Sequence, residues 1–165
     1  MHLLIKWILP VTLLASILIS CRNEIIRTSD EPRQDLSPME VVVSQLIALQ
    51  SNDQPDPDHG IMVAFAFASP KNKNNTGPIA RFKTMLHSDP YEPLLNHINY
   101  KVAEHFVQGS EAQFFVEITS RENEVIKYIF DLSQVKEAPY TGFWMTKAVI
   151  PIKNLGNPQN STINV

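Results

Sequence analysis

The fold is decided by the stretch from Ile98 to Leu132, which reads INYKVAEHFVQGSEAQFFVEITSRENEVIKYIFDL. The chain has 12 prolines, yet none lies between Leu94 and Ala138. Proline cannot donate the backbone hydrogen bond that an interior strand requires, so this region is suited to a continuous sheet. Apolar and polar residues also alternate along it, as they do in strands with one buried face. The stretch therefore predicts antiparallel strands joined by short turns.

Two short polar segments separate these strands. Gln108 to Glu111 suits a tight hairpin turn, and Arg121 to Glu124 offers Asn123 for a left-handed backbone position. Alternation places Phe114 and Val116 on the same face of one strand. With one further segment near the carboxyl end, the sequence predicts four strands, over residues 98–107, 112–119, 125–132 and 143–152.

A helix is predicted to open the domain. Ser37-Pro38-Met39-Glu40 is a capping box with proline at the first helical position, because the Ser37 hydroxyl can accept from the Glu40 amide while the Glu40 carboxylate reaches back. Apolar residues then recur at helical spacing as far as Leu49.

Two more helices are expected before the strands. Residues 60–68 (GIMVAFAFA) are apolar on all sides, as in a buried helix, and Ser69-Pro70 is expected to end it. Residues 71–77 (KNKNNTG) are expected to be a loop, followed by a third helix over residues 78–86. The predicted fold class is α+β, with three N-terminal helices packed on a curved four-stranded antiparallel sheet.

Composition narrows the function classes. The 165 residues are 44% hydrophobic and 19% charged, which excludes a disordered chain and fits one small domain. Against 17 acidic residues the chain has 14 basic ones, so no surplus positive charge is available to bind nucleic acid. The single cysteine, Cys21, excludes an internal disulfide and a cysteine-based zinc site. No motif in the sequence predicts a metal or another cofactor.

The amino terminus carries a targeting signal. Residues 7–20 (WILPVTLLASILIS) are uncharged and follow Lys6, like the core of a signal peptide. A helix over them would be roughly 21 Å long, too short for the ~30 Å hydrocarbon core of a membrane. The segment from Leu18 to Cys21 resembles the bacterial lipobox, which implies that Cys21 is lipidated and becomes the new amino terminus. The alternative is a chance cysteine after an ordinary secretory signal.

This interpretation divides the chain into four parts. They are a lipoprotein signal peptide (1–20), a polar lipidated tether (21–35), one α+β domain (36–153) and a flexible tail (154–165). The protein is expected in the cell envelope, held by its lipid on the extracytoplasmic side of a membrane. Arg22 stands where enteric bacteria use aspartate as an inner-membrane retention mark, so the outer membrane is favoured where one is present.

Three segments of the domain resemble an uncharacterised family of small bacterial, cyanobacterial and plastid proteins. They are Gln45–Asp53 (QLIALQSND), Phe67–Pro70 (FASP) and Thr76–Phe82 (TGPIARF), and the resemblance extends over residues 37–152. It implies the cone-shaped fold of nuclear transport factor 2, a cystatin-like fold in which a curved antiparallel sheet and helices enclose a pocket. It implies no particular activity.

Several polar residues are candidates for a site. Asp53, Asp56, Asp58 and His59 crowd one loop, but their spacing misses that of a calcium loop. We therefore expect Asp53 to end the first helix and Asp58 to cap the second. Arg81 is expected to pair with a carboxylate such as Asp53, and the alternative is that it binds an anionic ligand.

His97 and Glu104 lie near or on the first strand and are candidates for proton transfer, as in ketosteroid-isomerase relatives of the cone fold. Glu104 and His105 are adjacent, so only one of them can face a pocket. Because no catalytic constellation is complete, the sequence favours a non-catalytic binding module for a small apolar ligand or a partner protein. The first alternative is a cone-pocket enzyme, an isomerase or hydrolyase that works by proton transfer. The second is a purely structural envelope protein.

Overall fold

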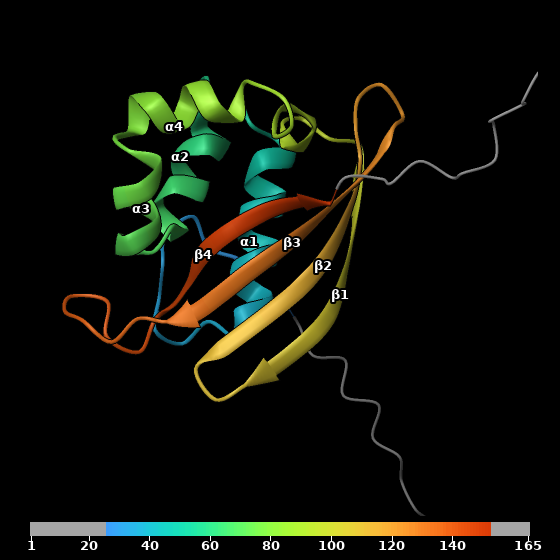
Figure 1. Cartoon of the computed structure of the whole chain (residues 1–165). Helices are drawn as coiled ribbons and strands as arrows, with labels where there is room; N and C mark the ends of the chain where they lie inside the picture. The colour runs from blue at the N-terminus through green and yellow to red at the C-terminus, as the bar shows by residue number, and fades with distance from the viewer. Residues whose placement is uncertain (1–25, 153–165) are drawn as a thin grey trace, which may run out of the picture.

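The second half of the chain forms a meander of four antiparallel strands in the order β1-β2-β3-β4 (Figure 1). The structure is a computed structural model and describes residues 26–152. Each predicted strand is confirmed, and Asn123 has the expected left-handed backbone, with a φ of 62°. The strands are β1 (Asn99–Gln108), β2 (Glu111–Thr119), β3 (Val125–Gln134) and β4 (Trp144–Ile152).

One face of the sheet forms a wall of the hydrophobic core. Phe114 and Val116 of β2 are buried on this face, as the alternation predicted, and Phe130 and Tyr128 are their partners on β3. Burial of each large apolar side chain contributes about 1.5–3 kcal/mol, so the alternation fixes which face turns inward. Phe115, between the two inward residues of β2, is 41% exposed.

Four α-helices and a short 3-10 helix precede the strands within the described residues. In Figure 1, α1 crosses behind the sheet, while α2, α3 and α4 gather on the side of β4. The α+β class is thus as predicted, with one more helix than the three expected. The elements are α1 (Pro38–Gln50), α2 (His59–Phe67), α3 (Pro70–Thr76), α4 (Ile79–Leu86) and η1 (Glu92–Leu94).

The start of α1 is confirmed by its capping box. Ser37 Oγ accepts from the Glu40 amide at 3.3 Å, and the Glu40 carboxylate accepts from the Ser37 amide at 2.8 Å. Behind this cap, Val41, Val42 and Leu46 are completely buried. The cap orients α1, and the apolar face holds it on the sheet.

The prediction of a loop at residues 71–77 is wrong, because Pro70–Thr76 form α3. Ser69 does not merely end α2: its Oγ accepts from the Asn72 amide at 3.2 Å and caps α3. Lys73 Nζ donates to the carbonyl of Ala66 at 3.0 Å. None of the residues of α3 is buried, so the helix has no apolar face that a sequence pattern could reveal.

The chain before α1 packs against that helix. The Arg27 guanidinium lies 2.9 Å from the Glu40 carboxylate and 2.8 Å from that of Asp35. The Ser29 amide donates to Ser44 Oγ at 3.1 Å. Among the described residues, packing therefore extends back to Arg27, ahead of Leu36, the expected start of the domain, because the polar stretch makes non-local ion pairs that its composition does not reveal. The signal peptide, Cys21 and the tail at 154–165 lie outside the described residues.

Candidate functional site

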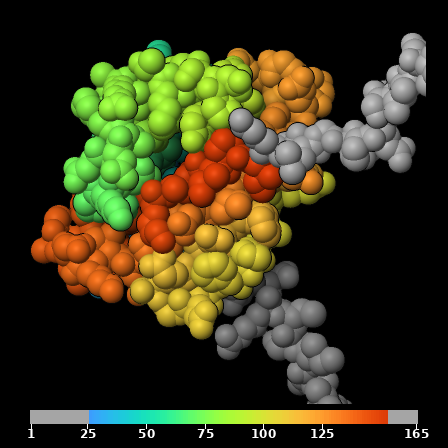
Figure 2. Space-filling view, in the orientation of Figure 1, coloured from blue at the N-terminus to red at the C-terminus, as the bar shows by residue number. Residues whose placement is uncertain are grey.

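A cavity of about 230 Å³ lies between the helices and the β4 side of the sheet. Figure 2 shows its mouth as a hollow between the green surface of α3 and α4 and the red surface of β4. Most of the lining is apolar and comes from all layers of the fold. It includes Leu49, Ala64, Phe82, Leu86, Leu94 and Phe130.

A buried pair of polar side chains borders the cavity. Gln45 of α1 donates through Nε2 to Thr146 Oγ1 of β4 at 2.9 Å, and Thr146 Oγ1 donates to Gln45 Oε1 at 3.1 Å. Gln45 Nε2 also donates to the Val41 carbonyl at 3.0 Å. Both side chains are 2% exposed, so their polar atoms satisfy one another within the protein.

Three further uncharged polar groups of the lining, those of Asn72, Thr76 and Tyr91, are also engaged as donors. Asn72 Nδ2 donates to the Thr146 carbonyl at 3.1 Å, and Thr76 Oγ1 donates to the Asn72 carbonyl at 3.0 Å. Tyr91 donates its hydroxyl proton to the Val149 carbonyl at 3.2 Å, and burial raises the pKa of this phenol. Asn75 completes the set and is exposed at the rim.

Lys147 contributes the only charged side chain of the lining among the described residues. It occupies a bulge, because Asp131 pairs with Ala148 and Leu132 pairs with Thr146. Its ammonium lies 2.6 Å from the Glu111 carboxylate and 3.3 Å from that of Asp131. The hydrogen bond to Glu111 is the main cause that raises the pKa of Lys147. The charge is therefore already compensated by the protein.

No Asp, Glu or His side chain lines the cavity within residues 26–152. General acid–base catalysis most often uses such groups, and also Lys and Tyr, within hydrogen-bond reach of the substrate. The titratable lining residues among those described are Tyr91, whose hydroxyl donates to the Val149 carbonyl, and Lys147, which is held by Glu111 and Asp131. The lining can enclose an apolar molecule and hydrogen bond to it.

Asp53 lies in the loop after α1, which ends at Gln50 with Ser51 as its C-cap, so the expectation that Asp53 ends this helix is wrong, and its partner is not Arg81. Its Oδ2 accepts from Asn96 Nδ2 at 2.9 Å, and its Oδ1 accepts from Asn52 Nδ2 at 2.9 Å and from the Asp58 amide at 3.1 Å. The hydrogen bond from Asn96 is the main reason that the pKa of Asp53 is lowered. Asp53 thus joins the loop after α1 to the segment before β1.

Arg81 and Glu104 are exposed and lie apart from the cavity lining. The guanidinium of Arg81, on α4, has no hydrogen bond or ion pair with the side chain or backbone of any other described residue. Glu104 lies on β1 beside a bulge between Glu104 and Phe106. The structure therefore brings neither residue together with Asp53 or His97.

His97 is buried outside the cavity and is 2% exposed. Its Nδ1 is 2.9 Å from the Leu94 carbonyl, and its ring meets Tyr100 edge-on with 5.7 Å between the ring centres. Nε2 has no hydrogen-bond partner among the described residues. Burial is the main cause that lowers the pKa of His97, so the neutral ring is favoured.

The expectation that Asp58 caps α2 is wrong. Asp58 has a left-handed backbone (φ 63°) and makes no cap bond with its side chain. Its carboxylate lies instead 2.7 Å from His87 Nε2 and 3.3 Å from Lys83 Nζ. Asn52 takes the capping role instead. This residue is 1% exposed, and its Oδ1 accepts from the Ile61 amide at 3.1 Å. Among residues 26–152, no group of three or more His, Cys, Asp or Glu is placed to hold a metal ion.

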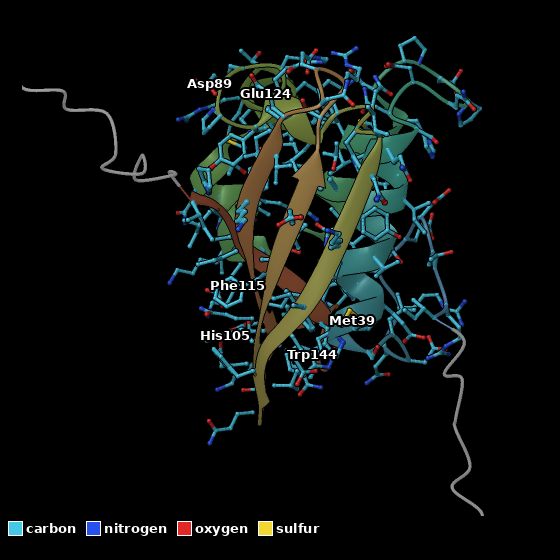
Figure 3. The ribbon with its side chains drawn as sticks, turned by 90° about the vertical axis from the view of Figure 1, so that its right-hand side faces the viewer. Met39, Asp89, His105, Phe115, Glu124 and Trp144 are labelled. Carbon is cyan, nitrogen blue, oxygen red and sulfur yellow. The ribbon has the colours of Figure 1, made fainter. Side chains whose placement is uncertain are left out.

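The outer face of the sheet carries exposed aromatic side chains. Figure 3 shows His105 and Phe115 on one side of the sheet and Met39 and Trp144 on the side of α1. The rings of His105 and Phe115 are 4.7 Å apart between centres. This face is separate from the cavity.

The polar residues of the cavity were not among the predicted site residues. Gln45 could have been found from the sequence, because it is a polar residue among the apolar residues that recur at helical spacing along α1. Asn72 and Thr146 could not, because their roles depend on contacts between α3 and β4 that are distant in the sequence.

Comparison of the chain with protein-family models, with curated proteins and with solved structures finds no match. The resemblance to the uncharacterised family thus stays a prediction. Over residues 26–152, none of the helices has the length and apolar character needed to cross a membrane.

Proposed function

We propose that the domain is a non-catalytic binding module that holds a small, largely apolar ligand in the cavity between the helices and β4. The observation that carries this proposal is the composition of the lining: an apolar cavity of about 230 Å³ with amide and hydroxyl groups and one compensated charge. Ligand pockets are typically apolar with a few placed polar groups. The volume exceeds the ~150 Å³ of an engineered cavity that binds benzene.

The test is binding of naphthalene, followed by its fluorescence and by the melting temperature of the protein. We expect saturable binding to the full chain. Ala64→Leu, which fills the cavity from α2, should abolish that binding. Ala80→Leu is the matched control, because it makes the same change at an exposed position of α4. Equal binding by both variants would place the ligand elsewhere.

The enzyme alternative requires proton-transfer groups in the pocket. Within the described residues the candidates for this role, His97 and Glu104, do not line the cavity.

A partner protein stays an alternative to a small ligand, and the exposed aromatic residues of the outer sheet face are the observation in its favour. Phe115→Ser separates the two, because it changes the outer face and should leave naphthalene binding intact.

We further propose that the module is lipid-anchored through Cys21 and stands on the extracytoplasmic side of a membrane in the cell envelope. The support is the lipobox-like segment that ends at Cys21. Arg27 is held against α1 by its bond to Glu40. The chain from Cys21 to Arg27 can span at most about 20 Å when fully extended, which would keep the domain close to the lipid surface. Cys21→Ser should abolish incorporation of a labelled fatty acid. A wild-type chain that takes up no label would refute the anchor.

For the fold, we propose an architecture like the cone of nuclear transport factor 2. Its support is the arrangement of α1 behind the four-stranded sheet with a cavity beside β4. An experimental structure of the domain would test this by comparing the curvature of the sheet and the depth of the cavity with those of known cones.

A further inference from the structure

We infer that the cavity takes an uncharged ligand with an apolar body and a hydrogen-bond donor, such as an alcohol or a phenol, at the mouth. This inference rests on the proposed function and specifies its ligand class. It follows from three properties of the lining: its size, its charge and the direction of its hydrogen bonds.

Size limits the apolar body. About 230 Å³ is more than the ~150 Å³ that accepts benzene and less than the ~300–1,000 Å³ of pockets for drug-sized molecules. In the described chain, no lining residue has a buried side-chain polar atom without a hydrogen-bond partner. A ligand of about two fused rings therefore suits the cavity.

Charge excludes an ionised head group from the cavity. The Lys147 ammonium is held at 2.6 Å by Glu111 and at 3.3 Å by Asp131, so it does not offer an uncompensated positive charge to a carboxylate. No acidic side chain lines the cavity in the described chain to receive an ammonium group. Transfer of an unpaired charge into such a site is strongly unfavourable.

The direction of the hydrogen bonds selects a donor. At the mouth, Asn72, Thr76 and Tyr91 each donate to a backbone carbonyl of the protein. The hydroxyls of Thr76 and Tyr91 each have one proton, so what they retain for a ligand is the ability to accept. Asn72 keeps its Oδ1 as an acceptor and one Nδ2 proton, since the other goes to the Thr146 carbonyl. A ligand that donates can use the oxygens of Thr76, Tyr91 and Asn72, whereas one that only accepts is left with the amide protons of Asn72 and of Asn75 at the rim.

A series of naphthalene derivatives tests the inference on the wild-type chain. We expect 2-naphthol to bind about 3- to 10-fold more tightly than naphthalene, as one net hydrogen bond would provide. In 2-methoxynaphthalene the oxygen stays but the donor is gone, so its affinity should fall to that of naphthalene or below. Ionised 2-naphthoate should bind weakest. The signal that disappears in Ala64→Leu defines binding in the cavity.

Two variants assign the acceptor. Tyr91→Phe and Thr76→Val each remove a hydroxyl, and the variant that removes the acceptor used should lower the ratio of 2-naphthol affinity to naphthalene affinity, with both affinities measured on that variant. Equal affinity of wild type for 2-naphthol and 2-methoxynaphthalene, or tightest binding of 2-naphthoate, would overturn the ligand class while the binding module stands. Failure of every member of the series to bind would overturn both.

Discussion

Gln45 and Thr146 are 101 residues apart in the sequence and form a reciprocal, fully buried hydrogen-bonded pair between α1 and β4. The backbone of Thr146 extends the connection, because its carbonyl accepts from the Ser69 amide at 2.9 Å and from Asn72 Nδ2 at 3.1 Å. Thr146 thus joins an edge strand to α1 and to the start of α3. This connection sets the distance between the two walls of the cavity.

Breaking this pair from one side should be more damaging than removing both partners. Gln45→Met or Thr146→Val alone leaves a buried polar atom without a partner, which costs about 1–3 kcal/mol of unfolding free energy. The double variant leaves no such atom, so its loss should be smaller than the sum of the single losses. A double-mutant cycle by urea unfolding measures the coupling, and strictly additive losses would contradict a direct interaction.

Asp53 should stabilise the fold through Asn96 rather than through Arg81. Asp53→Ala removes acceptors from Asn96 and from the Asp58 amide, and we expect a loss of about 1 kcal/mol. Asn96→Ala should show coupling with it in the same unfolding assay. Arg81→Met serves as the control and should change stability by no more than about 0.5 kcal/mol, as exposed substitutions do.

Glu40 should contribute stability that disappears in acid. Burial alone would raise the pKa of Glu40, but hydrogen bonds from Arg27 and Ser37 lower it from 4.5 to about 2. The folded state therefore favours the ionised form, so its contribution is complete above about pH 4.5 and is lost as the pH falls toward 2. Glu40→Gln should cost about 1–2 kcal/mol at pH 7, since Arg27 is half exposed to solvent.

The measurement for Glu40 is the unfolding free energy of wild type and Glu40→Gln between pH 7 and pH 3. The difference between them should shrink as the pH falls below 4.5. Glu31→Gln is the matched control, because Glu31 is exposed and its carboxylate has no hydrogen bond among the described residues. A difference that is constant with pH would exclude the ion pair as the cause.

His97 should make the protein less stable in mild acid. Its pKa is lowered mainly by burial, so below the ordinary value of 6.5 the unfolded chain binds a proton that the folded chain resists. Stability should therefore be complete above pH 6.5 and decline as the pH falls toward the lowered folded pKa. His97→Asn can keep a hydrogen bond to the Leu94 carbonyl but does not titrate.

Chemical unfolding at pH 7.5 and at pH 5.5 tests this effect. The decline should be smaller in His97→Asn than in wild type, whatever the variant loses in absolute stability. Replacement of the exposed His105 by asparagine should leave the decline unchanged. The same decline in wild type and His97→Asn would remove His97 as its source.

Sequence reasoning succeeded where the signal is local. The capping box of Ser37 and Glu40 determines the start of α1 through bonds within one turn. Alternation and the turn residue Asn123 were enough for the meander, because a strand with one buried face has a fixed side-chain period of two. The class of fold was therefore accessible without any tertiary information.

What only the tertiary structure decided depends on contacts between distant segments. α3 has no apolar pattern, and beyond its local cap at Ser69 it is held by the bond from Asn72 to the Thr146 carbonyl of β4. Asp53 finds Asn96, 43 positions away, since the fold brings the end of α1 to the start of β1 and leaves Arg81 in solvent. The cavity arises in the same way, because its walls belong to elements spread along the whole described chain. Hydrophobic and hydrogen-bonding patterns identify the elements, but the space left between them is a property of their packing.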